Sequence, residues 1–303
     1  MVTHDTKALF VAALRARGPA YREARARFLV APGDTRGVLA RCRQSRSWRV
    51  RLQADIFDTW LEDPGLCEQA RRLLQADPST GLPRRASARV RGEALAGLGS
   101  KALPRILELL TRSRGFASRP EQTALFHALV VLKDERAVRP LVALVLQNQD
   151  GTERAAAAHT LAWHRTPLAL PVFAAALADP ASPPGLRSSS IRGLLLLGTP
   201  EAAEALLRLA RDAEQQPDTR ATAIIALETV MEARAEPGLL GILQGEAPDA
   251  VASAALEVLG RVGSLAALDT LRALDTSDAK PRLRTAAAEA IRSIEQRHSA
   301  SGA

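Results

Sequence analysis

One short pattern recurs along most of the chain, and its spacing constrains the fold more than any other feature. A small residue precedes a leucine or isoleucine, and a further residue, usually apolar, follows three positions later. The anchor residues are 29 to 35 residues apart: Leu95, Leu129, Leu161, Leu194, Leu227, Leu256 and Ile291. A period in this range indicates an array of repeated units, each of which buries its apolar face against its neighbours.

Each repeated unit is expected to contain two short helices. Apolar residues spaced one, three and four positions apart lie on one face of a helix. Aromatic residues make up only 3% of the chain, and alanine and leucine, which are strong helix formers, supply most of the apolar side chains. Gly99, Gly198 and Gly260 follow the last apolar residue of a predicted helix, where helices commonly end. The sequence therefore predicts an all-α fold, an α-solenoid of about eight stacked antiparallel helix pairs.

The ends of the chain do not follow the repeat. Residues 1–46 are expected to form an irregular, Arg-rich helical cap, with helices at about Thr6–Arg17 and Tyr21–Val30. An atypical polar unit is what a stacked array needs at its terminus. The solenoid is predicted over residues 47–296, and the polar segment 297–303 is predicted to be a disordered tail.

Two further residue types keep their places in the repeat. An arginine lies seven positions before the anchor, and a proline lies early in the following helix: Arg154, Arg187, Arg220 and Arg284; Pro104, Pro140 and Pro171. With the Ala/Leu core and the glycine break, this pattern resembles HEAT repeats, particularly the short bacterial class called HEAT-like or phycobilisome-lyase-type repeats. The resemblance covers about residues 48–296.

The resemblance implies helix pairs stacked into a right-handed superhelix, with the first helix of each pair lining a concave side. We interpret the four recurring arginines as a structural ladder that bonds carbonyls or acids of the next unit; the alternative is a basic stripe for an acidic partner. The arginine is missing at Ala88, Gln122 and Asp249, so the ladder is not continuous.

The helical register also indicates which side chains point into the groove. If the positions at −8, −4, −1, 0 and +3 from the anchor form the core, those at −2 and +2 point outward. In the middle of the array these positions hold His127, Val131, His159, Trp163, Arg192, Leu196 and Ile225. Exposed Trp, Arg and aliphatic side chains are typical of protein-binding surfaces. We therefore expect a partner-binding groove here.

Positive charge is concentrated in the N-terminal third. Residues 1–120 contain 23 Lys and Arg against 11 Asp and Glu, whereas the whole chain carries a net charge of +8. One basic cluster surrounds a tryptophan: Arg41, Arg43, Arg46, Trp48, Arg49 and Arg51. Such a cluster could bind nucleic acid through phosphate contacts. Only four of the 41 basic residues are lysine, so the charge could instead reflect Arg-rich coding bias.

No catalytic or metal-binding motif is recognisable. The five histidines do not form the His-Glu pairs of HEAT-like di-iron hydroxylases, and His127 and His159 would need further ligands to hold zinc. A phosphate-binding glycine-rich loop and a nucleophile elbow are also missing. Trp48 and the nearby Asp55 only weakly resemble the groove of HEAT-like alkyl-base DNA glycosylases. A bilin lyase remains an alternative, because its repeats look like these.

The sequence offers no apolar run of the roughly 18 residues that a membrane-spanning helix needs. Cys42 and Cys67 form no metal or redox motif. We expect a cytoplasmic, non-enzymatic scaffold without a cofactor, which binds another protein or a peptide in its concave groove. The alternatives are a nucleic-acid-binding protein, such as a HEAT-like DNA repair glycosylase, and a bilin-lyase-type accessory factor.

Overall fold

The computed structural model describes residues 6–31, 33–83, 85–112, 119–230, 235–275 and 280–300. Within these ranges every regular element is helical, which confirms the predicted all-α class. The α-helices are α1 (Thr6–Arg15), α2 (Gly18–Leu29), α3 (Thr35–Arg43), α4 (Trp48–Glu62), α5 (Pro64–Leu74), α6 (Ala88–Ala96), α7 (Leu103–Arg112), α8 (Arg119–Leu132), α9 (Val138–Gln147), α10 (Gly151–His164), α11 (Leu170–Ala178), α12 (Pro184–Leu197), α13 (Pro200–Arg211), α14 (Pro217–Val230), α15 (Glu236–Leu243), α16 (Asp249–Val262), α17 (Leu268–Asp275) and α18 (Pro281–Ala300).

Short 3-10 helices connect several of these elements: η1 (Pro78–Thr80), η2 (Ser100–Ala102), η3 (Glu135–Ala137), η4 (Pro167–Ala169) and η5 (Leu265–Ala267). Four of them, η2 to η5, lie directly before the second helix of a pair. None of the helices in the described ranges has the length and apolar character that a bilayer span requires.

The chain divides into two compact units, residues 1–144 and residues 145–303, which we call unit 1 and unit 2. The boundary lies within α9. The sequence had placed a boundary at residue 46 instead. The structure gives no division there, because helices from both sides of residue 46 share one hydrophobic core.

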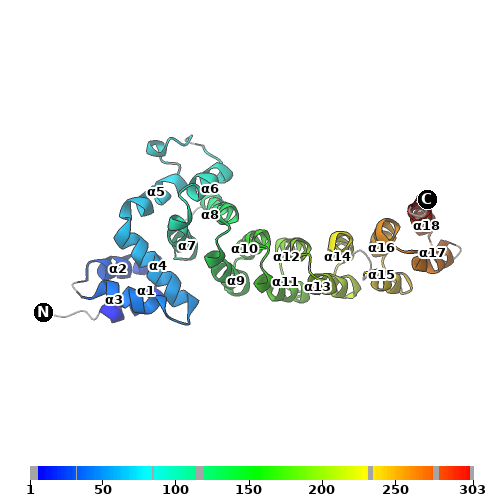
Figure 1. The fold of residues 1–303 in the computed structure, drawn as a ribbon, viewed down its shortest axis with the longest axis horizontal. Coiled ribbons are helices and arrows are strands. Elements are labelled where there is room, and N and C mark those ends of the chain that lie inside the picture. The colour runs from blue at the N-terminus through cyan, green and yellow to red at the C-terminus, as the bar shows by residue number, and fades with distance from the viewer. Residues whose placement is uncertain are drawn as a thin grey trace. The chain divides into compact units, whose positions relative to one another are not determined.

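That core is formed by α1, α2, α3 and α4 of unit 1 (Figure 1). Three phenylalanine rings meet at its centre: Phe10 packs edge-on against Phe28 and Phe57 at centroid distances of 5.8 Å, and Phe28 stacks on Phe57 at 4.5 Å. All three side chains are buried. Buried aromatic pairs stabilise a fold beyond the area that they bury, so this trio stabilises the Arg-rich N-terminal region despite its charge.

The remaining helices of unit 1 extend from this bundle. Helix α4 contacts α5 and α7, α5 contacts α6, and α6 packs closely along α8. At the α6–α8 contact, Gly92 has no space for a side chain: a Cβ there would lie 2.7 Å from the Ala124 carbonyl oxygen. The glycine therefore permits the close approach of these two helices.

Unit 2 is a regular stack of helices. The first helices, α10, α12, α14, α16 and α18, each contact the next one in the series, and the second helices include α11 and α13, which also touch. Figure 1 shows α10, α12, α14 and α16 in one row and α11, α13, α15 and α17 in another. Such stacking of helix pairs is the arrangement of an α-solenoid.

The number of pairs is close to the prediction. From α4 onward the described residues form seven consecutive helix pairs followed by α18, which has no second helix within the described ranges. The predicted register is also confirmed, since the six leucine anchors are fully buried. Ile291 on α18 is only half-buried, because no following first helix covers it within the described ranges.

Of the three predicted glycine breaks, Gly198 is the C-cap of α12, whereas Gly99 lies between α6, whose C-cap is Gly97, and η2. Gly99 and Gly198 have φ angles of +75° and +62°, in the left-handed region that glycine tolerates best. The prediction is wrong for Gly260, which lies inside α16. A Cβ at Gly260 would be 3.2 Å from the Cα atom of Ala290, so this glycine serves the contact between α16 and α18.

The predicted disordered tail begins too early. Helix α18 continues to Ala300, and Arg297 on its last turns donates hydrogen bonds to the carbonyl oxygens of Gly260 (2.8 Å) and Gly263 (3.2 Å). These bonds attach the helix end to the end of α16, where carbonyl groups lack partners within their own helix. Residues 301–303 lie outside the described residues.

Candidate functional site

The centre of the predicted groove is a pair of aromatic side chains on α10. Trp163 Nε1 donates a hydrogen bond to His159 Nε2 at 3.1 Å, and the two rings meet edge-on with their centroids 6.2 Å apart. They are four residues apart, so they lie one above the other on the same helix face. Burial, and then the positive charge of Arg192, lower the pKa of His159. His159 is therefore neutral near pH 7 and can accept the hydrogen bond.

The neighbouring first helices extend this surface. Arg192 and Leu196 lie on α12, which packs along α10, and Ile225 lies on α14, which packs along α12. Arg192 is exposed, Leu196 is half-buried, and Ile225 is 49% exposed. We call the surface formed by His159, Trp163, Arg192, Leu196 and Ile225 the first-helix face of unit 2.

The first-helix face ends after α14. The corresponding outward positions on α16 are Ala254 and Val258, and both are buried. The helical wheel thus holds for three helices and fails on the fourth. The exposed side chains of this part of α16 are polar ones, Ser253 and Glu257.

Two residues of the predicted groove belong to unit 1. His127 and Val131 lie on α8. His127 is part-buried, with its Nε2 atom 3.8 Å from Glu93 Oε1, which is beyond hydrogen-bond distance. Val131 is 49% exposed. Both side chains belong to unit 1, so they are not part of the first-helix face of unit 2.

The recurring arginines bond carbonyl groups at the end of the preceding helix. Arg154 Nε donates to the carbonyl oxygen of Val145 at 2.8 Å, and Arg220 Nε donates to that of Ala210 at 2.8 Å. Arg187 donates through Nη2 to the carbonyl oxygen of Pro180, which lies in the loop just after α11. A cation at these carbonyl groups satisfies unpaired acceptors and interacts favourably with the helix dipole.

The ladder differs from the sequence pattern at two places. Arg284 is exposed and its side chain makes no such bond to any residue that the structure describes. In unit 1, where the expected position holds Ala88, Arg91 acts from three residues further along and donates to the carbonyl oxygen of Leu74 at 2.9 Å. The sequence pattern missed Arg91 because it tested a single position of each unit.

The predicted basic cluster lies around the end of α3 and the start of α4, and much of its charge is neutralised. Arg43 pairs with Asp58 and, at 3.3 Å, with Asp55. Arg41 lies 3.6 Å from Asp34. These carboxylates reduce the positive potential that the residue count suggested.

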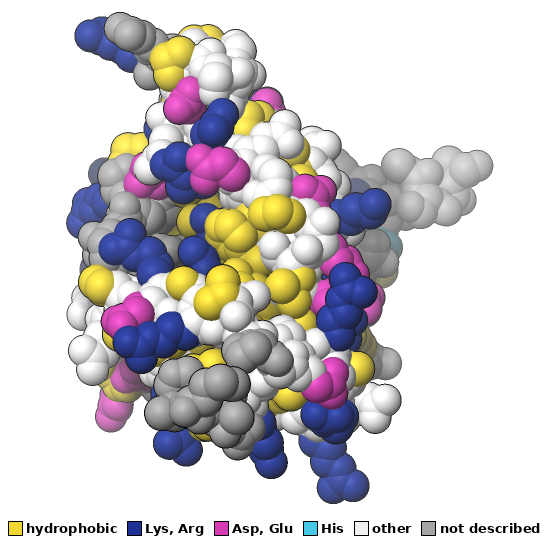
Figure 2. Space-filling model, turned by 90° about the vertical axis from the view of Figure 1, so that its left-hand side faces the viewer, with side chains coloured by type: hydrophobic (Ala, Val, Ile, Leu, Met, Phe, Trp, Pro, Cys, Tyr) yellow, Lys and Arg dark blue, Asp and Glu magenta, His cyan; other side chains and the backbone are white. Residues whose placement is uncertain are grey.

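The other members of the basic cluster are held locally. Arg51 donates to the carbonyl oxygen of Ser45, and the guanidinium of Arg49 lies over the Trp48 ring at 5.5 Å from its centroid. Arg46 is exposed. Figure 2 shows the end of the molecule that carries the N-terminal helices: Lys and Arg side chains are spread around it, with Asp and Glu side chains beside many of them. No observation favours this surface as a nucleic-acid site.

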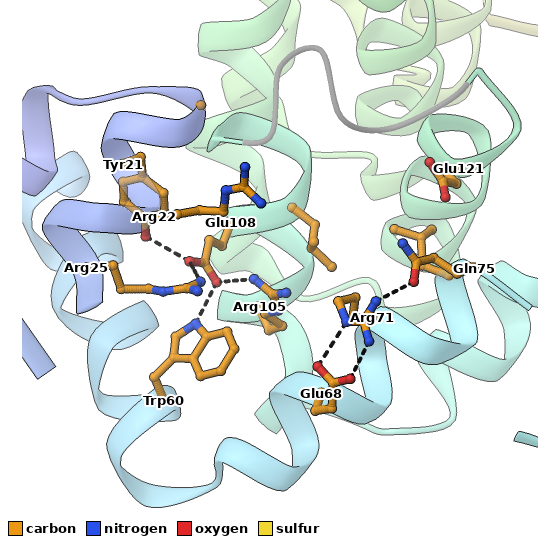
Figure 3. Close-up of a pocket in the computed structure, with 13 residues that line it drawn as sticks. Tyr21, Arg22, Arg25, Trp60, Glu68, Arg71, Gln75, Arg105, Glu108 and Glu121 are labelled. Atoms are coloured by element: carbon orange, nitrogen blue, oxygen red, sulfur yellow. Dashed lines mark hydrogen bonds and ion pairs between the residues drawn. The ribbon is translucent and has the colours of Figure 1, made fainter. Parts of the chain in front are cut away.

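A buried carboxylate that sequence analysis did not identify lies in unit 1. Glu108 on α7 has a side chain that is only 1% exposed. Four groups donate to it: Tyr21 Oη (2.9 Å), Arg25 Nη1 (2.7 Å), Trp60 Nε1 (2.8 Å) and Arg105 Nη1 (2.6 Å). Figure 3 shows these side chains converging on Glu108 from α2, α4 and α7. Such charge-assisted hydrogen bonds are short and strong.

The ionisation of this cluster follows from its surroundings. Burial alone would raise the pKa of Glu108, but the charges of Arg105 and Arg25, with hydrogen bonds from Trp60 and Arg105, hold it below its ordinary value. Burial, and then the charge of Glu108, raise the pKa of Tyr21 well above its ordinary value. At neutral pH Glu108 is therefore a carboxylate and Tyr21 a hydrogen-bond donor.

A cavity of about 400 Å³ opens beside this cluster. Its lining includes apolar groups of Leu74 and Leu109 together with charged and polar side chains: Tyr21, Arg22, Arg25, Trp60, Glu68, Arg71, Gln75, Arg105, Glu108 and Glu121. On its far side in Figure 3, Arg71 donates to Glu68 and to Gln75. Hydrogen bonds from Arg71, with a contribution from Arg72 and against partial burial, lower the pKa of Glu68 to about 2.

One sequence signal could have identified this site. Arg105 and Glu108 interrupt the apolar run Leu103–Leu110 with a spacing of three, which places them on one helix face among buried residues. A charged pair on the apolar face of a helix predicts a buried ion pair. The partners Tyr21, Arg25 and Trp60 carry no comparable signal, because they come from distant parts of the chain.

Within the described ranges, no three His, Cys, Asp or Glu side chains come together closely enough to hold a metal ion. His127 and His159, the two histidines considered as zinc ligands, lie in different units.

Comparison with known protein families identifies a repeat in the middle of the chain. Residues 140–228 match the family model of HEAT repeats. No curated protein matches the sequence. The matched segment contains α10 to α13 and nearly all of α14, and therefore the whole first-helix face of unit 2. The short bacterial, lyase-type class remains a prediction. The segment from residue 140 to residue 228 therefore contains HEAT repeats.

Proposed function

We propose that the chain is a non-enzymatic interaction scaffold that binds a partner protein or peptide on the first-helix face of unit 2. The observation that carries the proposal is the continuous run of Trp163, Arg192 and Ile225 over three consecutive first helices. Trp and Arg are the residues most enriched among those that dominate binding energy. HEAT repeats commonly act as protein-interaction scaffolds.

The dimensions of this face suggest a short partner segment. Packed helices lie about 8–10 Å apart, so the distance from α10 to α14 is about 16–20 Å. A partner helix of about 11–13 residues covers this length, at about 1.5 Å per residue. Apolar side chains of the partner would contact Trp163, Leu196 and Ile225, and a carboxylate would pair with Arg192. The expected partner is thus a short amphipathic segment with at least one acidic residue.

A peptide selection can test this proposal. Peptides of about 13 residues would be selected for binding to the intact chain, and their affinity would then be measured for the double variant Trp163→Ala with Arg192→Glu. We expect the affinity to fall at least tenfold, because both an anchor side chain and a charge partner are lost. The control double variant is Leu168→Ala with Arg208→Glu, which changes an exposed apolar residue and an exposed arginine away from this face.

The variants should retain the circular dichroism spectrum of the wild type. Equal affinity of the selected peptides for wild type and the Trp163/Arg192 variant would contradict the assignment of the face. A pull-down from the source lysate, at low salt and at about 0.3 M salt with nuclease treatment in parallel, would then identify a natural partner. Recovery of nucleic acid that is lost at higher salt would favour the basic cluster instead.

A further inference from the structure

We propose that the cavity of unit 1 is a binding site for a small organic oxyanion, a carboxylate or a phosphate monoester attached to an apolar group. This proposal is independent of the scaffold function, because all its residues lie in unit 1. It rests on the charge balance around Glu108, on the arginine donors that Glu108 leaves unused, and on the apolar part of the cavity lining.

Among the described residues, the cavity lining contains more positive than negative charge. Four of the described arginines line it (Arg22, Arg25, Arg71 and Arg105) against three glutamates (Glu68, Glu108 and Glu121). The imbalance is sharpest at Glu108, where two guanidinium groups share one carboxylate. Their side chains are only 17% and 7% exposed. A buried excess charge is costly unless a counter-ion compensates it, so this corner of the cavity favours an anion.

The arginines around Glu108 also retain donors. A guanidinium group has five N–H donors in a planar fork. Arg25 gives Nη1 to Glu108, whereas Arg105 gives Nη1 to Glu108 and Nε to the carbonyl oxygen of Cys67. Among the described residues, no other acceptor is bonded by either group. The remaining forks match the planar oxygens of a carboxylate or the oxygens of a phosphate.

The two guanidinium groups are fixed before any ligand arrives. Their Cζ atoms lie 4.1 Å (Arg25) and 4.8 Å (Arg105) from the centroid of the Trp60 ring, and Trp60 itself is held by its hydrogen bond to Glu108. Contacts of this kind restrict the rotation of long side chains. In Figure 3, Arg22 extends from α2 into the same space. A pre-ordered site loses little conformational entropy on binding.

The rest of the lining determines the kind of anion. Leu74 and Leu109 are almost fully buried and line the cavity together with Trp60. A volume of about 400 Å³ lies within the range of sites for small molecules, and far exceeds that of a single inorganic ion. The geometry therefore fits a ligand with one charged end near Arg25 and Arg105 and an apolar body against the leucines.

A calorimetric titration of the full chain tests the proposal. Three probes have the same aromatic ring and differ in charge: phenyl phosphate, phenylacetate and the uncharged benzyl alcohol. We expect at least one anion to bind and benzyl alcohol not to bind. Comparing phenyl phosphate with phenylacetate shows whether the site prefers a phosphate monoester or a carboxylate. If neither anion binds, or if benzyl alcohol binds equally well, the proposal is overturned.

Variants then locate the binding. Arg22 lines the cavity and is not one of the four donors to Glu108. Arg22→Gln should weaken binding of the anion about tenfold, the effect of one charge-assisted hydrogen bond. The matched control is Arg27→Gln on the same helix; Arg27 is exposed, pairs with Glu23 and does not line the cavity. It should leave the affinity unchanged. Equal affinities of the anion for wild type and the Arg22 variant would overturn the assignment to this cavity.

Glu108→Gln provides a second readout. The variant removes the carboxylate that competes for Arg25 and Arg105, so the anion should raise its thermal midpoint by more than it raises that of the wild type. A purely structural cluster would be weakened by the substitution and would not be rescued by the anion. A midpoint shift no larger than in the wild type would overturn the proposal, and the Arg22 comparison remains decisive if Glu108→Gln does not fold.

Discussion

Gly193 on α12 should not tolerate a single additional methyl group, although alanine is normally the better helix former. A Cβ atom built at Gly193 would lie 2.3 Å from Cε2 and 2.5 Å from Cζ of Phe173 on α11. Non-bonded carbon atoms prefer separations of about 3.5–4.0 Å, so the overlap is more than about 1 Å. The Phe173 ring is fully buried and cannot move into solvent to relieve it.

Two opposing effects determine the magnitude. Replacing glycine by alanine inside a helix stabilises a protein by about 0.5–1 kcal/mol. Overpacking a well-filled core costs about 1–3 kcal/mol, and this overlap belongs at the upper end of that range. Gly193→Ala should therefore lower the free energy of unfolding by about 2 kcal/mol. Gly241→Ala on α15 is the matched control, because a Cβ there meets nothing within 4 Å and should raise stability by about 0.5–1 kcal/mol.

Urea unfolding followed by far-UV circular dichroism would measure both variants. Because stacked repeats can unfold in parts, hydrogen exchange of the α11 and α12 amides should accompany the global measurement. Phe173→Leu should partly rescue Gly193→Ala, and the coupling energy from a double-mutant cycle would report the contact directly. The packing argument is refuted if Gly193→Ala is as stable as the wild type, or if Phe173→Leu gives no rescue.

Three further predictions concern Glu108, His159 and the recurring arginines. Glu108→Gln should lower the free energy of unfolding by about 3 kcal/mol at neutral pH, because two buried guanidinium groups lose their charged partner. The pKa of Glu108 is lowered from about 4.5, so its carboxylate stabilises the fold fully above that pH, and this stabilisation is lost as pH falls below it. Urea unfolding of wild type and variant at neutral and at acidic pH should therefore show the difference in stability shrinking at acidic pH. The pKa of His159 is lowered from about 6.5, so the neutral imidazole stabilises the fold above that pH, and this stabilisation is lost as pH falls below it. The fluorescence of Trp163 should change when His159 becomes protonated below pH 6.5. His159→Gln should remove this change. Arg220→Met should lower the free energy of unfolding by about 2 kcal/mol, because the hydrogen bond to the Ala210 carbonyl oxygen is lost. Arg284 is exposed, so Arg284→Met should lower it by less than about 0.5 kcal/mol in the same urea unfolding assay.

The repeat register could be predicted because it depends on short sequence separations. The anchors Leu95 to Leu256 are buried where the spacing placed them, since a helix face is fixed by residues three and four positions apart. The errors arose where a contact between helices decided the outcome. Gly260 was interpreted as a helix end, but it lies inside α16, where the missing side chain leaves room for Ala290 of α18.

The groove prediction also depended on the geometry of single helices and took no account of contacts between helices. Trp163, Arg192 and Ile225 were assigned to one surface from the helical wheel alone, and they lie on neighbouring helices in unit 2. The wheel failed at Val258 on α16, which is buried although its position is equivalent to that of Trp163. A helical wheel gives the direction of a side chain but not how closely the next helix packs against it.

The Glu108 cluster could not be predicted as a whole, because its members are too far apart in the sequence. Tyr21 and Glu108 are separated by 87 residues, and Trp60 and Glu108 by 48. No repeat relates these positions, and an alignment of the units treats them as irregularities. Arg105 alone gave a local signal, through its spacing of three from Glu108 inside an apolar run.

The two sets of arginines in this chain differ in whether the stacking of repeats accounts for them. Arg154, Arg187 and Arg220 recur at one place in the repeat, and each bonds a backbone carbonyl group at or just after the end of the preceding helix. Helix ends leave such acceptors without partners in their own helix, so the recurrence of the arginine has a structural cause. Arg25 and Arg105 do not recur, and they converge on one buried carboxylate beside a cavity. Stacking does not require this arrangement. In a repetitive protein, the buried charges that break the repeat are therefore the first ones to test for a ligand.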